Sequence, residues 1–170
     1  MLSPQHHLQT GWDEYKSGNY SSSIIAFERA LSAESGLADA YNGLGWAYIS
    51  YSSDPIINLT NLNTAFNKFD QALAIDSKNS DAWVGKAILI FINRESKQDL
   101  NEAIKAIDTA LQGEQIYLYR HDYDSKADLH ALKAQCYYYL DEYEKATAEI
   151  ENTLEIEKEN QVALKIKTLL

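Results

Sequence analysis

The chain has 170 residues, of which 45% are hydrophobic and 24% are charged, and it carries a formal net charge of −10. This composition is typical of a globular protein, and the length suits one domain or a short array of repeats. The acidic balance argues against nucleic acids and anionic membrane surfaces, which need clustered Lys and Arg, and no apolar run approaches the ~18–20 residues of a membrane span.

Two helices joined by a short turn are expected within residues 4–35. Gly11 and Tyr15 lie four residues apart, a spacing that places both on one face of a helix. Gly18, followed by Asn19 and Tyr20, is typical of a turn, because glycine and asparagine tolerate turn conformations. The second helix is expected to bury a stripe of residues that recur at helical spacing, namely Ser23, Phe27, Ala30 and Leu31.

The clearest pattern of the chain runs from residue 40 to residue 76. Its two halves are separated by residues 52–55, a Ser-Ser-Asp-Pro turn, and each half has apolar residues at three- and four-residue steps. We predict a helix, a turn and a second helix within residues 38–77. The first stripe is Tyr41, Leu44, Gly45 and Tyr48, and the second is Ala65, Phe69, Ala72 and Leu73.

Side-chain size within this stretch predicts how its two helices pack. Gly45 is expected at the closest approach of the helices, where nothing larger than alanine would fit. Phe69 and Leu73 are predicted core residues, whereas Trp46 is predicted to be partly exposed. Asp39 and Asp81 are each expected to open and cap a helix, because a carboxylate at that end suits the helix dipole.

Two further helix pairs are predicted within residues 80–113 and 126–158, with an insertion at residues 112–125 between them. Residues 160–170 are predicted to form a terminal capping helix. The glutamates between residues 149 and 159 are interpreted as the solvated face of an amphipathic helix. The expected apolar stripes comprise Trp83, Ala87, Ile90, Ala103, Ile107, Ala110 and Leu111, then Ala134, Tyr137, Ala146, Ile150, Thr153 and Leu154, and finally Val162, Ile166 and Leu169.

These stretches share a repeat period. Gly11-Trp12 and Gly45-Trp46 are 34 residues apart, and the 40–76 stretch matches W-x2-L-G-x2-Y followed by A-x3-F, with tyrosine in place of the tryptophan. The chain therefore resembles the tetratricopeptide repeat family. The resemblance implies a single all-α domain over residues 1–170, a right-handed α-solenoid of helix-turn-helix repeats with a capping helix.

No catalytic or cofactor motif accompanies these repeats. The sequence lacks a phosphate-binding loop, a zinc-protease motif, a nucleophile elbow and a paired C-x-x-C. The single cysteine, Cys136, lies in a predicted helix and is interpreted as a small buried hydrophobic residue. His121 and His130 are interpreted as solvated rather than metal-binding. We therefore expect no enzyme activity, no cofactor and no metal.

The resemblance implies a concave groove lined by the first helix of each repeat. When the family's groove positions are transferred to this sequence, many of them are aromatic residues. Such a groove favours a protein or peptide partner. Because the net charge is −10 and Lys16 is the groove's only cation, the expected ligand is a neutral-to-basic segment with apolar anchors. The candidate partner-binding residues are Trp12, Tyr15, Asn42, Trp46, Ile49, Ile88, Phe91, Gln135, Tyr138 and Tyr139.

Two alternatives stay open at this stage. The chain could instead bind a small molecule, or assist an enzyme, with the Tyr-rich insertion closing a pocket over the groove. The N-terminal stretch shows no basic region followed by an apolar segment, so we expect no signal peptide. The default expectation is a soluble cytoplasmic protein, and a periplasmic or surface-anchored one if the chain is a fragment without its leader. The oligomeric state stays undetermined.

Overall fold

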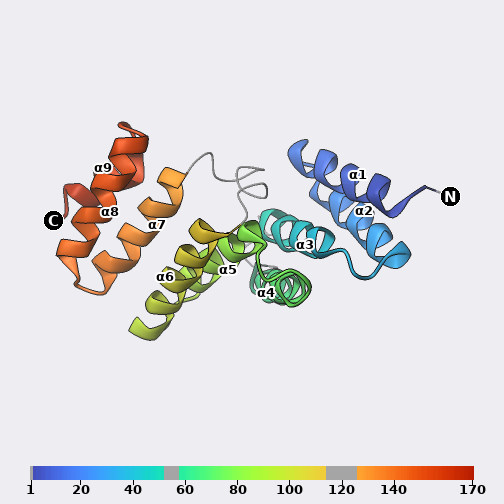
Figure 1. The fold of residues 1–170 in the computed structure, drawn as a ribbon, viewed down its shortest axis with the longest axis horizontal. Coiled ribbons are helices and arrows are strands. Elements are labelled where there is room, and N and C mark those ends of the chain that lie inside the picture. Colours follow the sequence, from blue (N-terminus) through green and yellow to red (C-terminus); the bar gives the residue numbers. More distant parts are fainter. Residues whose placement is uncertain (1, 52–57, 114–125) are drawn as a thin grey trace. The chain divides into compact units, whose positions relative to one another are not determined.

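The computed structural model describes residues 2–51, 58–113 and 126–170, and these residues form nine α-helices and no strand (Figure 1). The predicted 52–55 turn and the predicted insertion beyond Gly113 lie outside the described residues. The all-α prediction is confirmed. The helices are α1 (Pro4–Lys16), α2 (Tyr20–Ala33), α3 (Ala38–Tyr51), α4 (Asn58–Ile75), α5 (Ser80–Ile92), α6 (Lys97–Gln112), α7 (Lys126–Tyr139), α8 (Tyr143–Ile156) and α9 (Gln161–Lys167).

Helices that follow one another in the chain pack against each other. The largest contacts join α1 to α2, α3 to α4 and α7 to α8, which are the helix-turn-helix pairs. Further contacts join α2 to α3 and α6 to α7, and α9 packs on both α7 and α8. These contacts therefore join helices that are close in the sequence, and each of these helix pairs buries an apolar stripe between its own helices.

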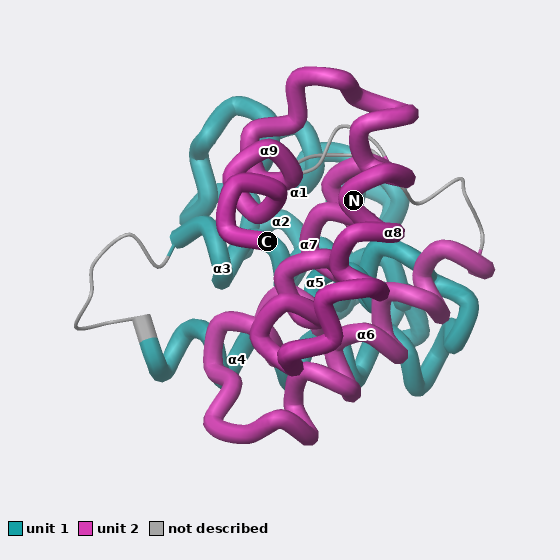
Figure 2. Tube along the Cα trace, turned by 90° about the vertical axis from the view of Figure 1, so that its left-hand side faces the viewer, with its two compact units in different colours: residues 1–85 teal, residues 86–170 magenta. Residues whose placement is uncertain are grey.

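Contacts divide the chain into two compact units, residues 1–85 and residues 86–170, and the division falls inside α5 (Figure 2). We call them unit 1 and unit 2. The organisation of residues 1–170 as one repeat domain stays a prediction.

Local signals explain where several helices begin. The Asn79 side chain accepts a hydrogen bond from the Ala82 amide at 3.0 Å and caps α5, so Asn79 rather than the predicted Asp81 is the cap. Ser96 and Asp99 form a reciprocal capping box at the start of α6. The tight turns before α2 and α8 each contain one residue with positive φ, Gly18 at 77° and Asp141 at 63°.

Two phenylalanine rings organise the core of unit 1. Phe27 and Phe69 are both fully buried. A Cβ atom placed on Gly45 of α3 would lie 2.5 Å from the Phe69 ring, and one on Gly85 of α5 would also collide with it. The Phe27 ring lies in the same way against Gly11 of α1 and Gly43 of α3. Each ring therefore fills the space between its own repeat and the next one.

The close approach at Gly45 leads to a stability prediction. Gly45→Leu is expected to lower the free energy of unfolding by about 1–3 kcal/mol, because the buried Phe69 ring occupies the space of even a first side-chain carbon. Urea unfolding followed by circular dichroism measures the change. Gly36→Leu is the control, since a Cβ there meets no atom within 4 Å. Equal stability of the two variants would contradict this packing.

Unit 2 has two buried clusters. Leu100, Ala103 and Ile104 of α6 pack with Cys136 of α7 and with Leu140 just beyond it. The second cluster joins α7, α8 and α9 through Ala134, Ile150, Ala163 and Ile166. The C-terminal helix α9 therefore covers the last helix pair, as predicted for a capping helix.

Candidate functional site

The candidate residues of unit 1 lie in its core. Trp12 and Tyr15 are 6% and 4% exposed, and Trp46 is 1% exposed with its ring 5.7 Å from that of Phe69. Asn42 is fully buried and donates a 2.7 Å hydrogen bond to the Asp81 carboxylate. The prediction that Trp46 is partly exposed is therefore wrong, and this structure does not offer these four side chains to a partner. Buried apolar rings and buried hydrogen bonds of this kind stabilise the fold.

Ile49 and Ile88 are half-buried. Ile49 lies near the C-terminal end of α3 in unit 1, and Ile88 lies on α5 in unit 2. Both keep some accessible apolar surface.

The remaining candidates come together in unit 2. The ring centroids of Phe91 and Tyr139 are 6.0 Å apart, and those of Tyr138 and Tyr139 are 5.6 Å apart. Tyr143 extends the group, with its ring 6.0 Å from that of Tyr138. The Arg94 guanidinium lies 4.2 Å from the Phe91 ring centroid and 4.4 Å from that of Tyr139. We call Phe91, Arg94, Tyr138, Tyr139 and Tyr143 the aromatic cluster.

The cluster is anchored on one side and accessible on the other. Phe91 packs against the α6–α7 core, and Tyr138 packs against the core between α7, α8 and α9. Tyr139 and Tyr143 are 48% and 50% exposed. Anchored aromatic rings with exposed faces contribute much of the energy of protein interfaces at a low entropic cost.

A pocket of about 200 Å³ opens beside the cluster, between α7 and the C-terminal segment. Val162, Ile166 and Leu169 supply its apolar wall. The opposite wall comes from Gln135, Tyr138 and Tyr139, and among the described residues Lys165 is the only charged side chain in the lining. Three predicted site residues thus share a pocket with α9, a helix that the sequence reasoning treated only as a cap.

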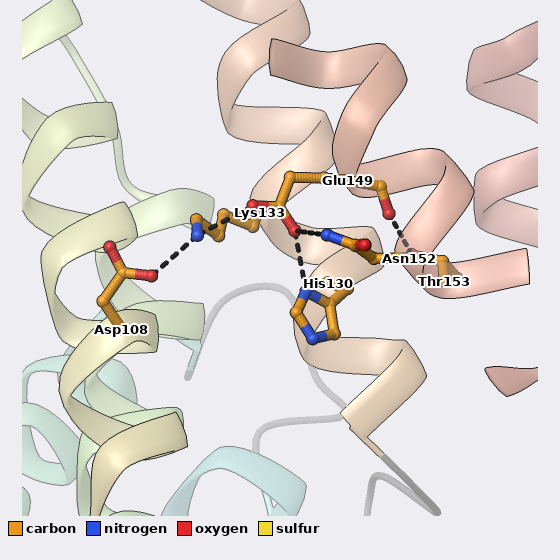
Figure 3. Close-up of polar contacts among 6 residues, drawn as sticks. All are labelled: Asp108, His130, Lys133, Glu149, Asn152 and Thr153. Atoms are coloured by element: carbon orange, nitrogen blue, oxygen red, sulfur yellow. Dashed lines mark hydrogen bonds and ion pairs between the residues drawn. The ribbon is translucent and has the colours of Figure 1, made fainter. Parts of the chain in front are cut away.

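A network of charged side chains holds α7 in place (Figure 3). Lys133 of α7 binds Asp108 of α6 at 2.7 Å and Glu149 of α8 at 2.8 Å. His130, one turn earlier on α7, is 2.7 Å from Glu149. The Lys133 and Glu149 side chains are only 13% and 11% exposed, so these ion pairs are shielded from water. The network fixes the helix that carries Gln135, Tyr138 and Tyr139.

This network is not predicted from the sequence. Glu149 and His130 were interpreted as solvated, and both interpretations are wrong. A signal was present, because Glu149 follows Ala146 by three residues and precedes Thr153 by four, which places it on the buried face of α8. The charge of Glu149 favours a solvent-exposed position, whereas its spacing on the helix indicates a buried one.

The electrostatics of Glu149 give a pH prediction. Burial acts to raise the pKa of Glu149, but hydrogen bonds from His130 and Lys133 outweigh it and lower the pKa to about 2 from an ordinary 4.5. A depressed carboxylate pKa stabilises the folded state above the unfolded pKa, and that stabilisation is lost as the pH falls from about 4.5 toward 2. We expect the free energy of unfolding of the wild type, measured in urea, to fall as the pH is lowered through this range.

Glu149→Gln should be less stable than the wild type at pH 7 and should lose less stability on acidification to pH 3. Glu151→Gln is the control, because Glu151 lies exposed on the same helix. A Glu149→Gln profile parallel to the wild-type profile would contradict the coupling.

The single thiol of the chain lies in the protein interior. Cys136 is fully buried, as predicted, and burial raises the pKa of its thiol to about 12, so the nucleophilic thiolate is scarce at neutral pH. Among the described residues, no group of three or more His, Cys, Asp or Glu side chains is placed to hold a metal ion. None of the described helices combines the length and apolarity needed to cross a membrane.

Solved structures share this arrangement of helices, although no protein-family model matches the sequence. PilF of Pseudomonas aeruginosa matches 91% of the chain with a TM-score of 0.69 and 17% identity, and the chain spans 61% of that protein's length. MamA matches 94% of the chain with a TM-score of 0.67 and 18% identity, over 76% of its own length. A thermophilic tetratricopeptide repeat protein of Thermus thermophilus matches 97% of the chain with a TM-score of 0.56 and 15% identity, over 96% of its own length.

The fold is that of the tetratricopeptide repeat proteins. At these identities the likeness establishes the fold, which confirms the helix-turn-helix repeats inferred from the sequence. In tetratricopeptide terms, α1, α3, α5 and α7 are the first helices of successive repeats. Phe91, Gln135, Tyr138 and Tyr139 all lie on such first helices.

Proposed function

We propose that this chain is a non-catalytic interaction scaffold that binds an apolar-anchored protein segment on the aromatic cluster of unit 2. The observation that carries the proposal is the exposed face of Tyr139 and Tyr143 beside a pocket that shares Tyr138 and Tyr139. Contiguous exposed aromatic surface is uncommon on proteins that bind nothing. The tetratricopeptide fold supports a scaffold, because stacked repeats present extended surfaces to partners.

Pocket size favours a protein partner over a small molecule. Sites for small molecules and cofactors usually enclose about 300–1,000 Å³, whereas the pocket beside the cluster holds about 200 Å³, close to one large side chain. A larger depression of about 420 Å³ is lined by residues 141–145. These residues are consecutive and belong to the turn before α8 and the first residues of α8, so they form an open surface and not an enclosed site. The alternative of a pocket closed by the Tyr-rich insertion falls on residues outside the described ranges.

Within this proposal the predicted binding residues divide into two groups. Phe91, Gln135, Tyr138 and Tyr139 form the contact surface, and Ile88 of the same unit offers additional apolar contact. Trp12, Tyr15, Asn42 and Trp46 are structural residues of unit 1. The net charge of −10 favours approach of a segment that is neutral to basic overall.

The proposal is tested by binding of the full chain to an array of capped peptides at low and high salt. We expect the bound peptides to share a large apolar residue and to be neutral to basic in net charge. Tyr139→Ala should weaken their binding roughly tenfold or more, because an interface anchor is removed.

Tyr51→Ala is the matched control. Tyr51 is as exposed as Tyr139, at 48%, but it lies at the end of α3 in unit 1. Both variants should keep the wild-type circular dichroism spectrum and melting temperature. Equal loss of binding in the two variants, or undiminished binding of Tyr139→Ala, would refute the placement of the site.

A further inference from the structure

The pocket beside the aromatic cluster is locally basic in an acidic protein. Residues 161–170 contain Lys165 and Lys167 and no acidic residue, although the whole chain carries −10. Lys165 lines the pocket, and no carboxylate from the described part of the chain does. Arg94 adds a second cation on the Phe91 and Tyr139 rings.

The two carboxylates in the turn between α7 and α8 already have partners. Asp141 binds Lys97 at 2.7 Å and accepts a hydrogen bond from the Tyr143 hydroxyl, while Glu142 pairs with Lys145. Lys165 forms no ion pair with any residue in the described ranges, and it is exposed. Its ammonium group is therefore available to a ligand that enters the pocket.

We propose that the pocket binds one large apolar side chain of a partner protein segment whose next residue is Asp or Glu, and that the acidic side chain pairs with Lys165. The inference rests on the proposed function and names the chemistry of its ligand. Val162, Ile166, Leu169, Tyr138 and Tyr139 surround the apolar side chain, and Gln135 offers hydrogen bonds to the segment's backbone. A volume of about 200 Å³ suits one such side chain and leaves the carboxylate at the rim.

This local preference is compatible with a ligand that is neutral to basic overall. Net charge governs approach over distances near the Debye length, about 8–10 Å at physiological salt, whereas an ion pair acts at contact. A segment with one acidic residue at its anchor and basic residues elsewhere satisfies both conditions.

The test uses the full chain and three capped peptides of nine residues with a central Phe. They are identical except that the residue after Phe is Glu, Gln or Lys, and NMR titration of the labelled protein gives each affinity. The Glu peptide should bind about two- to fivefold more tightly than the Gln peptide, as expected for a partly exposed ion pair, and the Lys peptide should bind most weakly. High salt should reduce these differences.

Substitutions at Lys165 then locate the preference. Lys165→Gln should remove the advantage of the Glu peptide, and Lys165→Glu should reverse the order so that the Lys peptide binds best. Lys167→Gln is the matched control, because it removes the same charge from the same helix without changing the pocket lining. It should keep the wild-type order.

The outcomes separate this inference from the proposed function. Equal binding of the three peptides, or loss of the preference in Lys167→Gln as well, would overturn the acidic-neighbour inference and leave apolar anchoring intact. Binding of none of them would overturn the inference, while array binding that is sensitive to Tyr139→Ala would still support the scaffold. If the array showed no peptide binding that depends on Tyr139, the proposed scaffold function would itself be refuted.

Discussion

Phe69→Ala is expected to lower the free energy of unfolding by about 3–5 kcal/mol, the usual cost of deleting a buried phenylalanine ring. Phe69 is fully buried, and its ring fills the space against Gly45 of α3 and Gly85 of α5. Gly45 and Gly85 have no side chains that could move into the cavity left by the Phe69 ring. The loss of stability should therefore fall near the upper end of this range. The variant would loosen two helix contacts at once.

Urea unfolding followed by circular dichroism measures this loss. Phe66→Ala is the matched control, because Phe66 lies on the same helix but is half-buried, and its removal should cost clearly less. If Phe66→Ala lowers the free energy of unfolding as much as Phe69→Ala does, the face of α4 that carries Phe69 would not be its main buried face.

Trp46→Ala is expected to destabilise unit 1 by a similar amount, about 3–5 kcal/mol. The Trp46 side chain is 1% exposed, and its ring meets Phe69 edge-on at an interplanar angle of 76°. Such edge-to-face pairs are favourable beyond the area that they bury. Because both rings contribute to one contact, the double variant with Phe69→Ala should lose less stability than the sum of the single variants.

Trp83→Ala is the control for this result. Trp83 is half-buried, and its indole N–H donates to the Ser77 carbonyl at an exposed position. Its replacement should cost less than that of Trp46. A stability of Trp46→Ala close to the wild type, with loss of peptide binding, would instead restore Trp46 to the binding surface.

Part of the candidate site could be predicted from the sequence. The resemblance to the tetratricopeptide repeat placed Gln135, Tyr138 and Tyr139 on one surface, and these three residues line one pocket in the structure. The same resemblance placed Trp12 and Trp46 in the groove, but both side chains are buried in unit 1. A helical period identifies residues that share a face, but it does not say whether a neighbouring helix covers that face.

Charged residues show the same limit. Glu149 has the buried spacing of α8, yet its charge suggested solvent, and its burial is possible because Lys133 and His130 of α7 supply counter-charge and hydrogen bonds. Asn42 is likewise buried because Asp81, distant in sequence, accepts its amide proton. Neither partnership has a local signal in the sequence.

The sequence by itself determined the all-helical class, the repeats and the packing of small residues against large ones. Helical period and side-chain volume are local properties, so they can be read without knowing which helices are neighbours. Only the tertiary structure decided which aromatic rings are core and which are exposed, and that α9 adds Lys165 and an apolar wall to the pocket. The physical reason is that burial and pairing depend on side chains brought together from different helices. Those contacts arise when the helices pack, and no single stretch of the chain encodes them.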